Sequence, residues 1–373
     1  MVNLTVRENE MHQVEKMVFT GRKPWWYGNS AQRGAVGVDL GENAITSDVA
    51  MKTAGLDWDV TKAASAVMDP TLTNVEGEPM WRAVPNESFL VRSSDGSVLG
   101  RCSDQYEVFQ NSEAFAFLDQ LSMQGDLLYH TAGSLDGGKR VWILAQSPFT
   151  MSIQRKSGAV NKHHAFLLCM IGHDGKSSIN LMLTDVRAEC ANTCAYADSR
   201  ANDSGVNFRI PHKGDIKGKI GIAALALSRL EVETEERRRV LQSLAQTAIT
   251  TDSMIDFATS IFLGLDGEQR EIDEQVKAFY TEATDRSKTL MENKVAAVTK
   301  LFVKGQGNEG DSAYDALQAF TEYFDHFDLG HIKDKIEKGK RAARVVQSSW
   351  IGAGAERKAL VYKRLREQRI RIS

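Results

Sequence analysis

The chain has 373 residues, of which 42% are apolar and 25% are charged, and its formal net charge is −3. These values are typical of a globular protein with a substantial core, and they exclude a polycation that binds nucleic acid by bulk charge. The apolar run at 165–171 is too short to cross a bilayer, and no signal peptide pattern begins the chain. Four cysteines are few for this length, which favours reduced thiols without a structural disulfide. We expect a cytoplasmic protein without membrane contact.

Charge is distributed unevenly along the chain. From residue 331 onward there are thirteen Lys or Arg and four acidic residues, a net charge of about +9, which leaves the first 330 residues near −12. The basic residues of this end alternate with Trp350, Leu360, Tyr362 and Leu365. Such a pattern indicates an amphipathic basic helix that suits a protein partner or a nucleic-acid strand.

The N-terminal part mixes polar segments with the aromatic cluster Pro24-Trp25-Trp26-Tyr27. Thr46-Ser47-Asp48 predicts the start of a helix, because Ser and Thr oxygens accept hydrogen bonds from the exposed N–H groups of a first turn. We interpret residues 1–75 as an N-terminal extension packed on the core rather than as an independent domain.

Three Asp-Gly pairs predict hairpins between residues 80 and 209. Asp-Gly supplies the positive φ angles that tight turns require, and a two-residue turn connects antiparallel strands. The pairs are Asp95-Gly96, Asp136-Gly137 and Asp174-Gly175, and they join strands at 89–92 and 98–101, at 127–132 and 140–145, and at 166–171 and 179–185.

Helical periodicity lies between and after these hairpins. Residues 112–123 place apolar side chains on one helical face, and a second helix is predicted to begin near Arg187 and to carry Cys190, Thr193 and Cys194. Residues 76–212 are therefore predicted to form an α+β core, an antiparallel hairpin-rich sheet with helices on one face.

Residues 213–373 are predicted to form a mostly helical region with a basic C-terminal end. The strand signal disappears here, and Gly and Asn residues at 305–310 mark the clearest break. The expected helices lie at 225–248, 254–263, 271–303 and 313–326, with further helical stretches between 331 and 370.

Several strings of this sequence together resemble the family catalogued as domain of unknown function number 932. In the core these strings include Gln110-Asn111-Ser112-Glu113-Ala114-Phe115, Thr131-Ala132-Gly133-Ser134-Leu135, His173-Asp174-Gly175 and Val186-Arg187. Gly310-Asp311-Ser312-Ala313-Tyr314-Asp315-Ala316-Leu317 and Ser349-Trp350-Ile351-Gly352 are similar to its phage/plasmid-related branch. The resemblance covers roughly 24–365 and implies a mobile-element setting near recombination and replication genes, without an established activity.

Metal and cofactor chemistry is not expected. Cys190 and Cys194 could share one face of a helix, but a metal requires further soft or imidazole ligands, and the histidines lack the paired short spacing of zinc modules. Gly133 and Gly137-Gly138 are not followed by the Lys-Ser/Thr of a phosphate-binding loop. We predict no metal and no cofactor.

A catalytic site is also not expected, and an enzyme built from polar strand ends is kept only as a further alternative. His173 beside Asp174 suggests acid–base chemistry, but turn formation explains the Asp-Gly pair and no Ser or Cys is placed as an activated nucleophile. Trp142 could stack on a base, although its apolar neighbours favour packing in the core.

Positively charged and polar residues at strand ends are the candidates for nucleic-acid binding. Arg187, Asn192 and Thr193 either satisfy the ends of a strand and a helix or contact phosphate, since helix N-termini and Arg both suit anions. Lys139 and Arg140 on the second hairpin would join them. The basic C-terminal end contributes Arg341, Arg344, Lys363 and Arg364.

The leading hypothesis is a non-catalytic phage or plasmid DNA-metabolism protein that binds single-stranded DNA in recombination or replication. A hairpin-rich sheet with a helix is broadly similar to annealing proteins, which act as rings or filaments, so we expect a homo-oligomer. The alternative is a mobile-element interaction protein that binds a host or phage protein, such as a component of a defence system.

Overall fold

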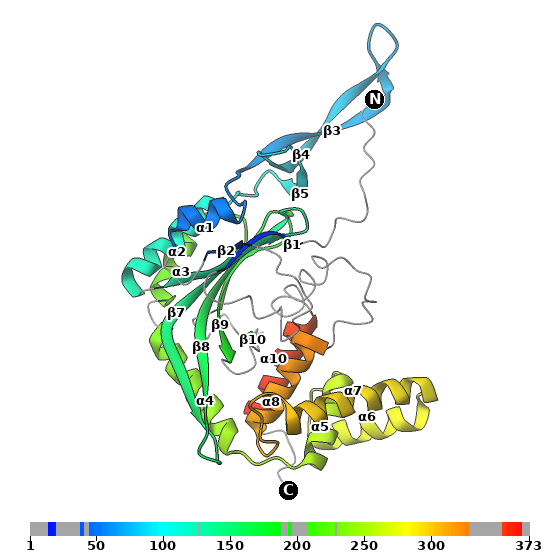
Figure 1. The fold of residues 1–373 in the computed structure, drawn as a ribbon. Helices are drawn as coiled ribbons and strands as arrows, with labels where there is room; N and C mark the ends of the chain where they lie inside the picture. The colour runs from blue at the N-terminus through cyan, green and yellow to red at the C-terminus, as the bar shows by residue number, and fades with distance from the viewer. Residues whose placement is uncertain are drawn as a thin grey trace.

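The computed structural model describes residues 14–19, 38–40, 45–125, 127–187, 193–195, 207–227, 230–327 and 353–367. This part of the chain contains a large sheet, a small sheet with a projecting arm, and a helical region (Figure 1). The predicted α+β class is confirmed, with antiparallel hairpins in the sheets and a mostly helical C-terminal region.

The large sheet has the strand order β10-β9-β8-β7-β6-β1-β2, and β11 pairs with β9. The pairings between its strands are antiparallel except for the parallel pair of β1 and β2. The strands are β1 Val14–Phe19, β2 Val38–Asp39, β6 Leu128–Leu135, β7 Arg140–Gln154, β8 Val160–Gly172, β9 Ile179–Arg187, β10 Thr193–Ala195 and β11 Asn207–Ile210.

Two of the predicted hairpins form the centre of this sheet. At the turn between β6 and β7, Asp136 and Gly137 have φ angles of 55° and 69°, the left-handed conformation that the Asp-Gly pair favours. The strands β7 and β8 extend well beyond their predicted ends and meet at a further turn, where Gly158 has a φ of 91°.

The prediction of a second helix that begins near Arg187 is wrong for the part of this segment that the structure describes. Arg187 ends β9, and Thr193–Ala195 is the strand β10, which pairs antiparallel with β9. Hydrogen bonding to the neighbouring strand therefore decides the conformation at 193–195. Cys190 lies outside the described residues.

The small sheet contains β3 Val60–Thr73, β4 Pro79–Arg92 and β5 Val98–Ser103. The hairpin at Asp95-Gly96, which joins β4 and β5, was predicted, but the pairing of β3 with β4 was not. The outer parts of β3 and β4 project from the body as a two-stranded arm (Figure 1). We call residues 66–83 the arm.

Helices α1 Ser47–Thr53, α2 Asn111–Gly125, α3 Ile216–Leu227 and α4 Leu230–Gln246 lie on one side of the large sheet (Figure 1). As predicted, α1 begins after Thr46, whose side chain accepts a hydrogen bond from the N–H of Val49. Fully buried side chains such as Val141, Ile143 and Leu167 form the first hydrophobic core with these helices.

The helical region contains α5 Thr251–Phe262, α6 Gln269–Glu282, α7 Asp285–Lys304, α8 Ala313–Glu322, the π-helical turn η2 Tyr323–Phe327 and α10 Ala353–Arg366. The single helix predicted at 271–303 is wrong, because Thr284 is extended, with ψ 154°, and its hydroxyl accepts from the N–H of Ser287 to begin α7. This region has its own hydrophobic core, which also includes Met151 and Ile153 of β7.

Buried polar contacts join the outer end of the β7–β8 hairpin to α8. Arg155 is 1% exposed and its Nη2 donates to both carboxylate oxygens of Asp315, each at 2.6 Å. Beside this pair, His163 lies 2.6 Å from both the Asp185 carboxylate and the Tyr314 hydroxyl. The sheet and the helical region are therefore held together by charge as well as by apolar contact.

Close backbone approach joins the two sheets. A Cβ on Gly100 of β5 would lie 2.2 Å from the carbonyl oxygen of Asp174, and one on Gly175 would lie 2.0 Å from the carbonyl oxygen of Arg101. The Tyr106 hydroxyl donates to the carbonyl oxygen of Gly172 at 2.9 Å in the same region. The turn after β8 thus both closes a hairpin and packs against β5.

We predict that Gly100→Ala lowers the free energy of unfolding by about 1–3 kcal/mol, because the added methyl group meets backbone that cannot move aside easily. The matched control is Gly221→Ala in α3, where a Cβ has nothing within 4 Å and alanine favours the helix. Urea denaturation of the two variants measures the difference, and an equal effect at both positions would contradict the proposed close packing.

Candidate anion-binding pocket

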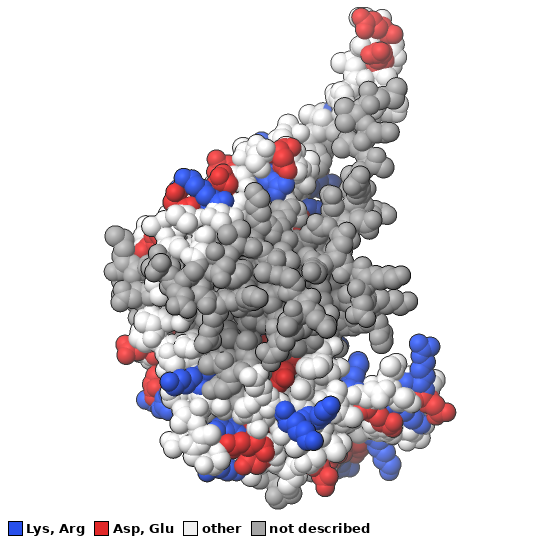
Figure 2. Space-filling model, in the orientation of Figure 1, with Lys and Arg blue, Asp and Glu red and all other residues white. Residues whose placement is uncertain are grey.

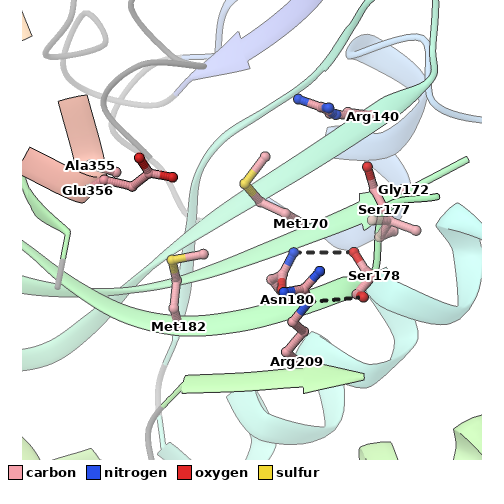
Figure 3. Close-up of a pocket in the computed structure, with 11 residues that line it drawn as sticks. Arg140, Met170, Gly172, Ser177, Ser178, Asn180, Met182, Arg209, Ala355 and Glu356 are labelled. Carbon is pink, nitrogen blue, oxygen red and sulfur yellow. Dashed lines mark hydrogen bonds between the residues drawn. The ribbon is translucent and has the colours of Figure 1, made fainter. Parts of the chain in front are cut away.

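A pocket with a volume of about 370 Å³ lies on the large sheet, between its strands and the start of α10 (Figure 3). Its sheet side is formed by residues of β7, β8, β9 and β11 and by Ser177 and Ser178 of the turn between β8 and β9. Ala355 and Glu356 of α10 line the other side. The pocket is thus built from segments that are far apart in the sequence.

Strand register explains why these side chains meet. Trp142 pairs with Met170, Met170 with Asn180, and Asn180 with Arg209, so the four residues form one row across β7, β8, β9 and β11. Paired residues in antiparallel strands share a face of the sheet. Since the alternate residue Ile171 packs in the core beneath α2 and α3, this row faces the opposite side.

Two arginines supply the positive charge of the pocket. Arg140, at the start of β7, keeps 27% of its side chain exposed, and Arg209 is exposed on β11. The Nε of Arg209 donates to the Ser178 hydroxyl at 3.2 Å, and Asn180 donates to the Ser178 carbonyl oxygen at 3.2 Å (Figure 3). These hydrogen bonds hold a hydroxyl group and an amide group beside Arg209, and no carboxylate takes part in them.

The nearest acidic partner of Arg140 is Asp174, whose carboxylate lies 3.9 Å from the Arg140 Nε. Burial alone would raise the pKa of Asp174, but hydrogen bonds from Ser177 and Lys176 outweigh it and the pKa lies below its usual value. Asp174 is therefore ionised at neutral pH. Because 3.9 Å exceeds hydrogen-bond length, it offsets part of the charge of Arg140 without accepting from the Nε.

Glu356 places a carboxylate on the α10 side of the pocket. In Figure 3 its side chain points from α10 toward the space between Arg140 and the floor residues Met170 and Met182. The pocket therefore combines two cations, hydroxyl and amide groups, an apolar floor and one opposing acid. This set suits an elongated anionic ligand with an apolar part.

The predicted basic residues are only partly brought together. Lys139 lies half-buried in the turn before Arg140, and its carbonyl oxygen accepts from the His173 N–H at 2.7 Å. Arg187 and Thr193 lie on the paired strands β9 and β10, and the structure describes only the backbone of these two residues. Asn192, Arg341 and Arg344 lie outside the described residues.

The two predicted residues of α10 are engaged by the protein itself. Lys363 pairs with Asp266 at 2.5 Å. Arg364 is 1% exposed, donates to the Ser260 hydroxyl at 2.6 Å, and lies 5.0 Å from the centre of the Phe257 ring. The prediction of an Arg364 contact with DNA does not fit this position, because its guanidinium is enclosed in the helical core.

Sequence reasoning missed Arg209, Asn180 and Glu356. The strand β11 has only four residues, and no tight two-residue turn joins it to β9, so its place next to β9 was not evident. One signal was available, since Phe208 and Ile210 are apolar and flank Arg209 in the alternation of a half-buried strand.

His173 is a buried structural residue rather than an acid–base group. It is 0% exposed, its Nε2 lies 2.9 Å from the Asn111 Oδ1, and its ring packs edge-on against Trp58. Burial, followed by the nearby His212, lowers the pKa of His173 to about 3. The imidazole is therefore neutral at pH 7. Trp142 is also 0% exposed, but the strand register places it on the same face as Met170 and Asn180, opposite the first hydrophobic core.

We predict that His173 makes the fold sensitive to acid. Below its ordinary pKa of 6.5, the unfolded chain takes up a proton that the folded chain does not accept until the pH nears 3, so stability falls as the pH falls through this range. His173→Gln keeps an N–H toward Asn111 and removes this titration. Urea denaturation between pH 7 and pH 4 is expected to give a smaller loss of stability for the variant, and identical losses would contradict the assignment.

Other chemistry has little support in the described part of the chain. No group of three His, Cys, Asp or Glu there is arranged to hold a metal ion, and no helix there is long and apolar enough to cross a membrane. Cys102 and Cys169 are buried free thiols, and burial raises the pKa of Cys169 to about 12. A thiol of this kind is a poor nucleophile.

The fold and the pocket define an α+β protein with a pocket on its large sheet that contains Arg140 and Arg209, which we call the two-arginine pocket. The family model described as Domain of unknown function (DUF932) matches residues 98–350, about two-thirds of the chain, and the chain belongs to this family. The matched region includes Arg140 and Arg209 but not the arm or Glu356. No curated protein and no solved structure matches the chain.

Proposed function

We propose that this protein binds single-stranded DNA at the two-arginine pocket and catalyses no reaction on it. The observation that supports this proposal most is the placement of Arg140 and Arg209 around a single pocket, although they are far apart in the sequence. Guanidinium groups bind phosphate through paired hydrogen bonds, which makes Arg well suited to a phosphodiester backbone.

The remaining pocket residues fit a nucleotide unit of an extended strand. Ser177, Ser178 and Asn180 add hydroxyl and amide groups beside the arginines, while Met170 and Met182 offer a soft apolar floor to a base. A volume of about 370 Å³ is in the range of small-ligand sites, so it admits one unit of a strand rather than a base-paired duplex.

The attraction must be local, because the chain as a whole is acidic. With a net charge of −3, bulk electrostatics does not draw DNA to this protein. The proposed binding surface therefore includes Arg209. It does not include Lys363, which pairs with Asp266, or Arg364, which is buried in the helical region.

We also propose that the protein acts in the cytoplasm, in recombination or replication of a phage or plasmid, and that it self-associates. The mobile-element setting is what the family resemblance implies. We propose that self-association takes place through the arm.

We predict that Arg140→Ala and Arg209→Ala each weaken binding of an oligo(dT) strand about tenfold, because each removes a charge-assisted contact to phosphate. Fluorescence anisotropy at several salt concentrations measures this, and the slope of log K against log salt is expected to shrink by about 0.7 per lost contact. The matched control is Arg270→Ala on α6, where the arginine side chain is 89% exposed and pairs with Glu274. Equal losses in all three variants, or none in the pocket variants, would contradict the proposal.

We predict the opposite effect for Glu356→Gln. The Glu356 carboxylate faces the arginines across the pocket and repels a bound phosphate, so the amide is expected to tighten oligo(dT) binding severalfold. Anisotropy under the same conditions checks this. Weaker binding by the variant would place the DNA elsewhere or give Glu356 a different role.

A further inference from the structure

The arm carries an unusual amount of exposed apolar surface. Met68, Trp81 and Met80 expose 56%, 68% and 46% of their surface, and they lie on a ribbon that extends away from the body (Figure 1). Within the described residues, β5 pairs only with the inner part of β4, at 87–91, so residues 66–83 form a ribbon of two strands. Such a ribbon is marginally stable in water on its own.

The pairing register separates the arm into two faces. Ala66 pairs with Ala83 and Met68 pairs with Trp81, and these alternate residues share one face. This apolar face contains no charged side chain. The opposite face, where Arg82 lies 3.3 Å from Asp69, also carries Val67 and Met80 and is mixed in character.

The charge of the arm argues against nucleic acid or an anionic membrane as its partner. Residues 66–83 contain Asp69, Glu76 and Glu78 and a single basic residue, Arg82. Figure 2 shows acidic side chains at the tip of the projection. A polyanion is repelled by such a surface, whereas an uncharged face of another arm is not.

We propose that the apolar face of the arm packs against the same face of a second copy of this chain. On this face a row of two small residues, Ala66 and Ala83, lies beside a row of two large ones, Met68 and Trp81. A two-fold axis that runs across the strands midway between the rows sets Trp81 over the partner's Ala83 and Met68 over the partner's Ala66. The face is therefore complementary in shape to itself.

This arrangement also explains how the exposed ribbon avoids further aggregation. An interface related by a two-fold axis uses the same patch on both copies and closes as a dimer. The acidic tips then point in opposite directions, away from each other. An open, exposed apolar ribbon would otherwise be a template for uncontrolled association.

Sedimentation equilibrium of the full chain tests the proposal. The wild type is expected to approach twice the monomer mass of 41.3 kDa as its concentration rises. Trp81→Lys is expected to raise the dimer dissociation constant at least tenfold by placing a charge in the interface. The matched control is Met80→Lys, the neighbouring exposed position on the opposite face, which is expected to leave the constant unchanged.

A size-exchange experiment tests the two-fold geometry itself. Trp81→Ala and Ala83→Trp are each expected to weaken the dimer, because one leaves a gap and the other sets tryptophan against tryptophan. The double variant exchanges the large and small positions and is expected to recover most of the wild-type affinity. Circular dichroism confirms that each variant is folded before its mass is measured.

A wild type that stays monomeric at all concentrations would overturn the proposal, as would equal effects of Trp81→Lys and Met80→Lys. A double variant as weak as its parents would overturn the proposed register. Arm variants that form the same dimer as the wild type but no longer bind a different protein would assign the arm to that partner. This result would also overturn the dimer proposal. The proposed DNA pocket lies on the large sheet and not on the arm. Oligo(dT) binding by the monomeric Trp81→Lys variant therefore tests the DNA-binding proposal separately from the dimer proposal.

Discussion

The buried contact between Arg155 and Asp315 is the constraint on which the arrangement of this protein depends. A charge removed from water is costly unless a partner of opposite sign accepts it with good geometry. Arg155 finds that partner only when the outer end of the β7–β8 hairpin meets the start of α8. The pair thus favours one relative placement of the sheet and the helices, more specifically than apolar packing alone.

Further buried polar contacts fix the elements between this pair and the pocket. Asp185 of β9 lies within 2.8 Å of Arg237 of α4 and also contacts His163. Beyond α8, the buried pair of Asp325 and Lys358, at 2.7 Å, fixes α10 to the π-helical turn. Because α10 carries Glu356, these contacts decide how the helical side of the pocket faces Arg140 and Arg209. The fold therefore holds both sides of the pocket in place.

Much of the sheet could be predicted from the sequence, because local turn chemistry encodes it. Asp136-Gly137 and Asp174-Gly175 gave hairpins with the correct strands, and Thr46 marked a helix start. The arm was missed because its strands are exposed on both faces and apolar residues occur on both, so the sequence does not alternate cleanly between apolar and polar residues. The break at Thr284 was missed because the helical pattern continues across it.

The pocket could be predicted only in part, since it depends on contacts between distant segments. Arg140 was identified beside its turn, whereas Arg209 joins it through the pairing of β11 with β9. The charge pattern of α10 suggested a basic surface, yet Arg364 finds Ser260 and the Leu265 carbonyl oxygen inside the helical core. Sequence periodicity indicates that a side chain is charged, but the tertiary partners decide whether it reaches solvent.

The central claim is that DNA lies across the two-arginine pocket. The most direct test is to photocrosslink the wild-type protein to an oligonucleotide that contains 4-thiothymidine. Mass spectrometry then identifies the crosslinked peptides. The account predicts crosslinks to peptides of β8, β9 and β11, near Met170, Met182 and Arg209, and their loss when unlabelled oligo(dT) competes. Crosslinks confined to α5, α6 and α7, or crosslinks that persist under competition, would contradict it.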